Sequence, residues 1–529
     1  LNVVIMFRTT ILFLICLYSA VGVVESARIL GIFSMPSISH QVVFRALTFE
    51  LAKKGHELVI FTPNPALPID RPPDNITEID TGQSYQILSE IMERAFNKNI
   101  LKRGVVMSLR TMNGDGISRA MIKLVSTQFD LPEVRNIIED KSQKFDLVIV
   151  EPILSIPLIV GKIFDAPVIL FSSFYGSSEI YEIMGALSWH PMYYPSFYRT
   201  KYKDLTLLEK IGAMYLEWRL IKASFTTDEK ENELLKTRFG PDAPTVKELR
   251  ENVRMLFLNA HPIMGNNRPV PPSVVYLGGM HLKPPKELPQ DLKSYLDASS
   301  RGVIFVSFGT NVRPSNMDQD FLEAFLDAFE SLPYDILWKF DGESLGRIPN
   351  NLRIQKWFPQ RDLLMHPNVK AFVTQGGLQS TDEAINAAVP LVGIPMIVDQ
   401  WYNVNKYVEL GIGVQIDALT MTADDLSQAV TKVINDVSYR QNIRRIRAII
   451  NDQPETPVER AVWWTEHVLR HGGNYLRAPS ANTTWTEYLM VDVLVVVLGT
   501  IVGLVTILIF TCYTILNLFK KKFIKPKLN

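Results

Sequence analysis

Short runs of Val, Ile, Leu and Phe recur along the chain and alternate with longer amphipathic stretches. The runs show little polar alternation, which is typical of strands buried on both faces of a parallel sheet. Amphipathic stretches such as 42–54, 320–331 and 426–435 predict helices between them. Repeated strand–helix units predict an α/β fold with doubly wound domains. The predicted strands are 28–34, 58–62, 145–150, 168–172, 255–259, 303–308, 336–340, 369–374 and 391–395.

Both ends of the chain carry apolar runs that do not fit this pattern. The run 11–24 follows Arg8 and ends at Glu25-Ser26-Ala27, as secretory signal peptides do. The run 493–518 is long enough to cross a bilayer at about 1.5 Å per residue. Five lysines follow it, and positive charge stays on the cytosolic side. The sequence therefore predicts a signal peptide over 1–26, a transmembrane helix over 490–518, a cytosolic tail over 519–529 and a luminal body.

Two further features agree with a luminal body. The chain ends in Lys525-Pro526-Lys527-Leu528-Asn529, which resembles a lysine-based endoplasmic-reticulum retrieval signal, although lysines that only set the topology remain an alternative. The sequons at Asn75 and Asn482 predict N-glycosylation. We therefore expect a single-pass type I glycoprotein of the endoplasmic-reticulum membrane.

Cysteine usage restricts how the body is stabilised. The two cysteines, Cys16 and Cys512, both lie in the apolar ends, so the body has none and needs a large core in place of disulfides. A cysteine-based zinc site is excluded. The formal net charge of +0 argues against a nucleic-acid partner.

A proline-rich segment predicts the boundary between two domains. Proline blocks both helices and central strands. We therefore expect an N-terminal domain over 27–262, a linker over 263–289 and a C-terminal domain over 290–475. The prolines are Pro262, Pro269, Pro271, Pro272, Pro284, Pro285 and Pro289.

Polar and glycine residues follow several predicted strands, and ligands of open α/β sheets bind outside the carboxyl ends of strands. The clearest example is Gln375-Gly376-Gly377, where a strand turns tightly into a helix start. Backbone N–H groups and the helix dipole make such a turn a site for a phosphate or diphosphate. The aromatic-rich stretch 185–228 fits no strand, and two interpretations stay open: a cover for an apolar ligand or the membrane, or a helical insertion with its own core.

The block from Trp357 to Gln400 resembles the signature of the UDP-glycosyltransferase family, which includes UDP-glucuronosyl- and UDP-glucosyltransferases. The matching motifs are Trp357-Phe358-Pro359-Gln360, Leu364-Met365-His366-Pro367, the Gly376-Gly377 turn, Glu383, Val392-Gly393-Ile394-Pro395 and Asp399-Gln400. The segment 375–383 looks most like the insect branch. The resemblance implies the GT-B fold, in which two Rossmann-like domains face each other. The N-terminal domain would bind the acceptor and the C-terminal domain the UDP-sugar.

The resemblance also implies roles for individual residues. Trp357 would stack on uracil, Gln360 would bind the nucleoside, and Glu383 would bind the ribose hydroxyls. Asp399 and Gln400 would bind sugar hydroxyls. The diphosphate and the rest of the UDP-sugar would contact Ser307, Gly309, Thr310, Gln375, Gly376, Gly377 and Gln379. Most of the family has His at the position of Gln375, so this neutral amide predicts weaker donor binding, since a bond to a charged group is worth about 1.5–3 kcal/mol.

By the same resemblance, His40 is the catalytic base and Glu151 the carboxylate that orients it. A base at a helix start is kept neutral, and it needs an orienting partner. The family has Asp where this chain has Glu151, one methylene longer. Asp146 lies at the other end of the same predicted strand and is interpreted as a cap. His366 is interpreted as structural.

These residues predict an inverting transfer of a sugar, glucose by analogy with the insect branch, from a UDP-sugar to a hydroxyl of a small lipophilic acceptor such as a phenol or steroid. A detoxification role follows from such acceptors. Neither a metal nor a cofactor beyond the UDP-sugar co-substrate is expected, and a homo-oligomer is compatible with the sequence. The alternative is a non-catalytic module that keeps the same fold for nucleotide-sugar or partner binding.

Overall fold

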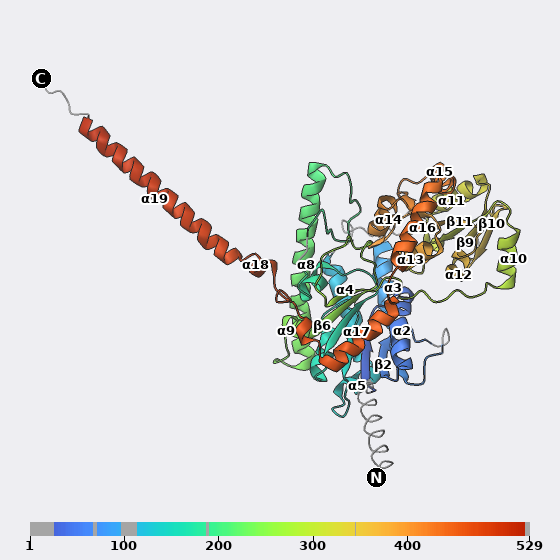
Figure 1. Cartoon of the computed structure of the whole chain (residues 1–529), viewed down its shortest axis with the longest axis horizontal. Helices are drawn as coiled ribbons and strands as arrows, with labels where there is room; N and C mark the ends of the chain where they lie inside the picture. Colours follow the sequence, from blue (N-terminus) through green and yellow to red (C-terminus); the bar gives the residue numbers. More distant parts are fainter. Residues whose placement is uncertain (1–25, 67–70, 97–113, 187–189, 344, 524–529) are drawn as a thin grey trace, which may run out of the picture.

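The computed structural model describes residues 26–66, 71–96, 114–186, 190–343 and 345–523 (Figure 1). These residues form two parallel sheets covered by helices, and a long C-terminal helix that leaves the body (Figure 1). The predicted signal peptide and the tail lysines Lys525 and Lys527 lie outside the described residues.

The first sheet has seven parallel strands in the order β3-β2-β1-β4-β5-β6-β7. Its central strands are fully buried, because helices cover both faces. One face packs against α2 (Ile38–Lys53) and α17 (Pro457–His471). The other packs against α4 (Gly114–Asp130), α5 (Pro132–Glu139), α6 (Ile159–Ile163) and α8 (Leu207–Phe239). The strands are β1 (Arg28–Ile32), β2 (Glu57–Thr62), β3 (Ile76–Asp80), β4 (Leu147–Val150), β5 (Val168–Ser172), β6 (Val253–Leu258) and β7 (Val274–Tyr276).

The second sheet has six parallel strands in the order β10-β9-β8-β11-β12-β13. Its two faces are covered by α11 (Gln319–Ser331) and α15 (Ala423–Asn435) on one side, and by α10, α13, α14 and α16 on the other. The strands are β8 (Val303–Ser307), β9 (Asp335–Lys339), β10 (Leu352–Gln355), β11 (Val369–Thr374), β12 (Leu391–Gly393) and β13 (Gly413–Gln415). The helices are α10 (Gln290–Ala298), α13 (Leu378–Ala387), α14 (Gln400–Glu409) and α16 (Val437–Asn451).

Short helices complete the body. They are α3 (Ser84–Phe96), α7 (Ser178–Ile183), α9 (Val246–Arg250), α12 (Gln360–Leu364) and α18 (Trp485–Tyr488), with 3₁₀ turns at Ile156–Leu158, Pro314–Asn316 and Asn474–Leu476.

All nine predicted strands are present, and the structure adds four that the pattern missed. The four are β3, β7, β10 and β13, and each is an edge strand of its sheet. β3 contains three polar residues among its five, and β7, β10 and β13 have only three or four residues each, so no long hydrophobic run marks them. The predicted helix 42–54 begins earlier, at Ile38, which places His40 inside its first turn.

Two elements differ from the predicted domain ranges. The range 263–289, predicted as a linker, contains β7, which pairs with β6 and completes the first sheet. The helix α17 lies within the predicted C-terminal domain, but its residues Ala461, Val462 and Val468 are buried in the core of the first sheet. The chain therefore crosses back to the N-terminal domain because the apolar face of α17 packs on α2.

The helix α19 (Val491–Phe523) follows this return crossing. It is long and apolar enough over Val491–Lys522 to cross a membrane (Figure 1). The most apolar part of this helix is not buried against the rest of the protein. Lys520, Lys521 and Lys522 lie in its last turn. The predicted C-terminal span is thus present as a single exposed helix.

Candidate active site

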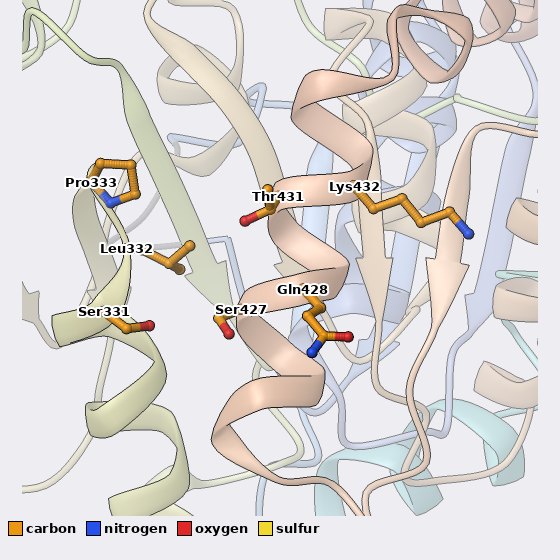
Figure 2. Close-up of a pocket in the computed structure, with 7 residues that line it drawn as sticks. All are labelled: Ser331, Leu332, Pro333, Ser427, Gln428, Thr431 and Lys432. Carbon is orange, nitrogen blue, oxygen red and sulfur yellow. The ribbon is translucent and has the colours of Figure 1, made fainter.

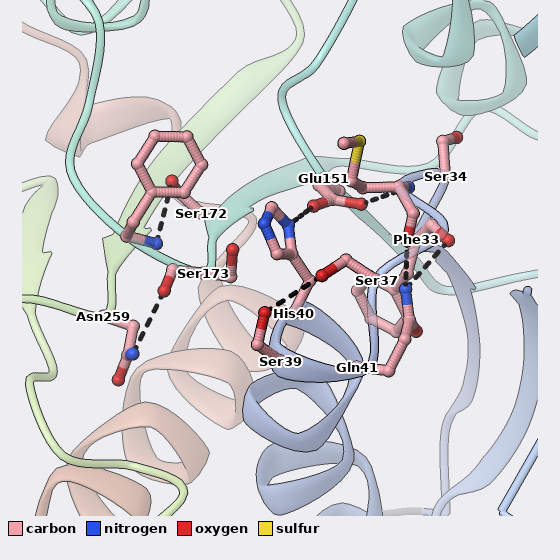
Figure 3. Close-up of polar contacts among 12 residues, drawn as sticks. Phe33, Ser34, Ser37, Ser39, His40, Gln41, Glu151, Ser172, Ser173 and Asn259 are labelled. Carbon is pink, nitrogen blue, oxygen red and sulfur yellow. Dashed lines mark hydrogen bonds and ion pairs between the residues drawn. The ribbon is translucent and has the colours of Figure 1, made fainter. Parts of the chain in front are cut away.

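His40 and Glu151 are brought together at the carboxyl edge of the first sheet. His40 lies in the first turn of α2, after β1, and Glu151 directly follows β4. Because β1 and β4 are parallel neighbours, both residues emerge at the same edge. The Nδ1 atom of His40 lies 2.6 Å from Oε1 of Glu151 (Figure 3). Glu151 is 1% exposed and its other carboxylate oxygen accepts the N–H of Met35 at 2.8 Å.

The loop between β1 and α2 is held by Gln41, which sequence reasoning missed. The Gln41 amide donates to the carbonyl of Met35 at 3.0 Å, and its oxygen accepts from the Thr62 hydroxyl at 2.9 Å (Figure 3 shows Gln41 beneath the loop). Met35 in turn donates to Glu151. Gln41 therefore supports the histidine–carboxylate pair from behind, and its place one residue after His40 is the signal that could have revealed it.

The predicted diphosphate turn lies at the carboxyl edge of the second sheet. The strands β8 and β11 are neighbours, with Ser307 opposite Thr374, so the loops that follow them lie side by side. Gly377 is the N-cap of α13 and forms no side-chain cap. The first-turn N–H groups of α13 therefore remain open to an anion. Gln375 is buried, and no described residue donates to its side-chain oxygen.

Gly309 allows Gln375 to take this position. It adopts φ +70°, and a Cβ added there would lie 2.5 Å from Nε2 of Gln375. The Gly309→Ala substitution should therefore displace the Gln375 amide. We expect UDP to bind roughly 10–100-fold more weakly, the equivalent of one lost bond to a charged group, in calorimetric titrations.

A matched control separates this contact from backbone strain. Gly346 also adopts positive φ, +74°, but a Cβ added there meets nothing within 4 Å. Gly346→Ala should lower the free energy of unfolding by a similar amount, roughly 1–2 kcal/mol, and leave UDP binding unchanged. Equal UDP affinity in the two variants would show that the approach of Gln375 to Gly309 does not matter for the donor.

Trp357 presents an open aromatic face beside a half-buried cation, Lys339. It is 62% exposed, in the loop between β10 and α12. The Nζ atom of Lys339 lies 4.4 Å from its ring centroid and donates to the carbonyl of Gly309 at 2.8 Å. Burial lowers the pKa of Lys339. Lys339 was not predicted; its place at the end of β9, at the same sheet edge, was the available signal.

Gln360 and Glu383, predicted to bind the nucleoside, lie in direct contact. The Gln360 amide donates to Oε2 of Glu383 at 2.7 Å and to the Ser380 hydroxyl at 2.9 Å. Burial raises the pKa of Glu383 to about 7. Burial, with the neighbouring charge of Glu383, raises the pKa of Asp382 to about 8. A pair of neighbouring carboxyls that is costly to ionise suits a site that binds hydroxyl groups, since the neutral form also donates a hydrogen bond.

Asn403 links the two domains at the site, and sequence reasoning missed it. It is fully buried, and its oxygen accepts from the hydroxyl of Tyr175, which follows β5 in the first sheet, at 2.8 Å. Its amide donates to the Gly376 carbonyl at 2.8 Å and to Oδ2 of Asp399 at 2.9 Å. One side chain therefore connects the domain of the first sheet, the glycine turn and Asp399.

The carboxyl group of Asp399 interacts electrostatically with His40. Burial raises the pKa of its carboxyl, while the bond from Asn403 and the nearby His40 act in the opposite direction. Tyr175 and Ser173, which follow β5 of the first sheet, bond to Asn403 and Gln379 of the second domain, so the two carboxyl edges face each other at this point. The remaining contacts across the domains include the ring pair Tyr175 and Tyr402, with centroids 5.1 Å apart.

Two other predicted residues have contacts that the pattern did not indicate. The Gln379 amide reaches across the domains and donates to the carbonyl of Ser173 at 3.0 Å. The Gln400 oxygen accepts the N–H groups of Met396 and Ile397, both at 2.9 Å, and so supports its own loop. Thr310 is exposed, next to the buried Ser307.

The residues predicted to lie outside the site are far from it along their strands. Asp146, at the start of β4, accepts the N–H of Arg28 at 2.7 Å at the opposite edge of the first sheet. His366 precedes β11 and lies 3.0 Å from Asp297.

The amide nitrogen of Asn75 donates to two carbonyls, at 2.8 and 2.6 Å, and that of Asn482 donates to one, at 2.8 Å. A glycosylated amide nitrogen keeps one hydrogen, so a glycan on Asn75 would remove one of its two bonds, whereas Asn482 could keep its single bond.

A hollow of about 430 Å³ lies elsewhere in the second domain, between the end of α11 and the middle of α15 (Figure 2). None of the predicted site residues lines it, and it contains no acid–base pair. Across the described part of the chain, no group of three or more His, Cys, Asp or Glu side chains is placed to hold a metal ion.

Comparison with known sequences places these features in a family. The family model described as UDP-glucoronosyl and UDP-glucosyl transferase matches residues 30–526. The ecdysteroid UDP-glucosyltransferase of Lymantria dispar multicapsid nuclear polyhedrosis virus is 42% identical, over 92% of this chain and 95% of that protein. UDP-glucosyltransferase 2 of Dactylopius coccus is 30% identical, over 93% of this chain and 94% of that protein.

Comparison with solved structures concerns the fold. The spinosyn forosaminyltransferase SpnP superposes with a TM-score of 0.56 at 16% identity, covering 84% of this chain and 100% of that one. The UDP-glucose: anthocyanidin 3-O-glucosyltransferase in complex with UDP gives a TM-score of 0.54 at 15% identity, covering 84% of this chain and 99% of that one. These likenesses confirm the predicted GT-B arrangement of two facing Rossmann-like domains.

Proposed function

Because the chain belongs to the UDP-glucuronosyl and UDP-glucosyl transferase family, and is a UDP-glycosyltransferase, we propose that it transfers glucose from UDP-glucose to a hydroxyl of a small lipophilic acceptor, with inversion. The observation that carries this proposal is the bond between His40 and Glu151 opposite Asp399 and the glycine turn. An acid–base pair and an anion site facing each other suit transfer between two bound substrates.

His40 is the general base of the proposed reaction. With Nδ1–H donated to Glu151, the other ring nitrogen carries a lone pair and lies on the side of the ring away from Glu151 (Figure 3). It takes the proton of the acceptor hydroxyl, and the Glu151 carboxylate stabilises the imidazolium that forms.

The acceptor oxygen then attacks the anomeric carbon of the donor sugar. The new C–O bond forms as the bond to the β-phosphate oxygen breaks, and UDP leaves with the electron pair. The first-turn N–H groups of α13 and the turn at Gly376-Gly377 stabilise its charge. A single displacement inverts the anomeric centre and gives a β-glycoside from an α-linked donor.

Aromatic side chains on the acceptor side favour a lipophilic substrate. Phe174 lies 5.7 Å from the His40 ring, and Phe197 packs edge-on against Phe174 at 5.5 Å. The viral relative is named as an ecdysteroid UDP-glucosyltransferase, which specifies a steroid acceptor for that protein. We propose a steroid or phenol as the acceptor. No observation favours the non-catalytic alternative, since the residues of the base, the turn and the nucleoside site are all present in contact with their partners.

The proposed location is the endoplasmic-reticulum membrane, with α19 as a single type I anchor and both domains in the lumen. Support comes from the length and exposure of α19 and from the lysines in its last turn. Detoxification by glucosylation, and glycosylation of Asn75 and Asn482, remain predictions of this location.

A donor and acceptor panel tests the proposed function. Microsomes containing the full chain are supplied with UDP-glucose, UDP-glucuronate or UDP-galactose, together with an ecdysteroid or a simple phenol. We expect release of UDP and a β-glucoside with UDP-glucose, and at least tenfold less turnover with the other donors. A faster reaction with UDP-glucuronate would overturn the donor, and absence of UDP release with every pair would overturn the proposed reaction.

A further inference from the structure

The N-terminal half of α8 carries an exposed apolar stripe that the catalytic site does not use. Its members recur at helical spacing and are 54–74% exposed: Leu207, Ile211, Met214, Tyr215, Trp218 and Phe225. Ala213 and Glu217, on the opposite face, are buried against the body, and Glu217 accepts the N–H of Ser196 at 2.9 Å. The stripe therefore faces away from the protein core. A contiguous exposed apolar face of this kind is typical of a surface that binds a protein, a membrane or a ligand.

The chemistry around the stripe is that of a membrane interface. Tyr215 and Trp218 stack with centroids 5.9 Å apart, and Lys222 lies 5.6 Å from the Trp218 ring. Lys210 and Arg219 are also exposed on the same turns. Tyrosine and tryptophan rings prefer the headgroup level of a bilayer, and long basic side chains can extend from there to the lipid phosphates.

The membrane anchor leaves the body beside α8. The segment before α18 is bound to the end of α7, where Asn482 N–H donates to the Glu182 carbonyl at 3.0 Å. It is also bound to α9, where Lys247 lies 3.6 Å from Glu487. Both α7 and α9 contact α8. In Figure 1 the N-terminal half of α8 projects past the sheets on the flank from which α19 departs.

The tether is too short to keep this flank away from the bilayer. Glu487 is still in contact with the body, and the span begins four residues later, at Val491. Four extended residues reach about 14 Å at most. A body held this close to the lipid brings its projecting apolar helix to the membrane surface.

We propose that the N-terminal half of α8 lies on the luminal surface of the bilayer, with the stripe inserted at the boundary between headgroups and acyl chains. This inference rests on the membrane anchoring by α19 that is part of the proposed function. Docking at two points, the anchor and α8, fixes the orientation of the two domains relative to the membrane.

Site-specific fluorescence tests the proposal in the full chain. After Cys16→Ala and Cys512→Ala, a bimane label is placed at Ile211→Cys in the stripe, or at Glu233→Cys, which is exposed on the polar C-terminal half of the same helix. The protein is reconstituted in phosphatidylcholine nanodiscs, one chain per disc. We expect lipids with doxyl groups to quench the label at 211 by at least half, and aqueous iodide to quench it at least threefold less efficiently than the label at 233.

The remaining outcomes overturn the proposal. If both labels are quenched by iodide alike and neither by doxyl lipids, α8 does not touch the bilayer. If the label at 211 is shielded from iodide without doxyl quenching, and the chain sediments as a dimer in detergent, a second copy covers the stripe instead. Turnover of a water-soluble phenol in the same discs reports the proposed reaction separately, so loss of docking and loss of catalysis are distinguishable.

Discussion

The substitution His40→Ala should lower kcat by about 10²–10⁴-fold, the usual contribution of a positioned general base. The reason is geometric: His40 is bonded to Glu151 at 2.6 Å through Nδ1, which leaves its other nitrogen to take the acceptor proton. The proposed UDP contacts lie in the second domain, so the affinity for UDP should stay within about twofold. Initial rates with saturating UDP-glucose and a phenol give kcat, and calorimetry gives UDP affinity.

His366→Ala is the matched control for removing an imidazole. His366 precedes β11 at the far edge of the second sheet, where it lies 3.0 Å from Asp297. Its removal should leave kcat unchanged. Near-normal turnover in the His40 variant, with the protein folded and binding UDP, would eliminate His40 as the base.

The second large effect is expected for Glu151→Gln, a loss in kcat of about 10²–10⁴-fold, as for the orienting carboxylate of other acid–base pairs. An amide at this position can donate to Nδ1 of His40, which moves the ring proton to the other nitrogen. That nitrogen can then no longer accept a proton from the substrate. The amide oxygen still accepts the Met35 N–H, so the fold should be retained. Circular dichroism and UDP affinity check the fold, and initial rates give kcat.

Two further variants make this prediction specific. Glu151→Asp keeps the charge but shortens the side chain, so its kcat should fall between those of the wild type and the Gln variant. Asp146→Asn removes a carboxylate from the same strand at the opposite edge, where it accepts the Arg28 N–H, and should leave kcat unchanged. If the Gln variant keeps wild-type kcat, or if Asp146→Asn costs as much, Glu151 is not the orienting residue.

The strands that sequence pattern predicted share one property. They occupy the middle of the two sheets, where both faces are buried and a continuous apolar run is required. The strands that pattern missed, such as β7 with its three residues among prolines, pair along one side only. The hydrophobic pattern therefore predicts the central strands, which are buried on both faces, and misses the edge strands.

The site divides in a similar way. The glycine turn at Gly376-Gly377 could be located because ligands of open α/β sheets bind at the carboxyl ends of strands, whereas His40 and Glu151 were assigned through the resemblance to the family. Lys339, Gln41 and Asn403 were missed. The positions of Lys339 and Gln41 along the chain gave a signal, but the partners that define the roles of all three residues are distant in sequence.

Gln375 shows what the sequence reveals about a residue and what only the structure reveals. Its replacement of the family's histidine was visible in the sequence, but its burial and its approach to Gly309 were not. The same holds for Gln379 and Gln400, whose amides are engaged by Ser173 and by the loop at Met396 and Ile397.

Local patterns thus decide which segments are strands, helices and the apolar C-terminal helix, since periodicity and length act within one segment. Motif spacing decides the family and nominates the base and the donor turn. The tertiary structure decides what depends on contacts between distant segments: the return of α17 to the first domain, the bond between His40 and Glu151, and the link from Tyr175 through Asn403 to Asp399. It also decides which apolar side chains remain uncovered, because the stripe on α8 has the spacing of a core helix and only packing leaves it exposed.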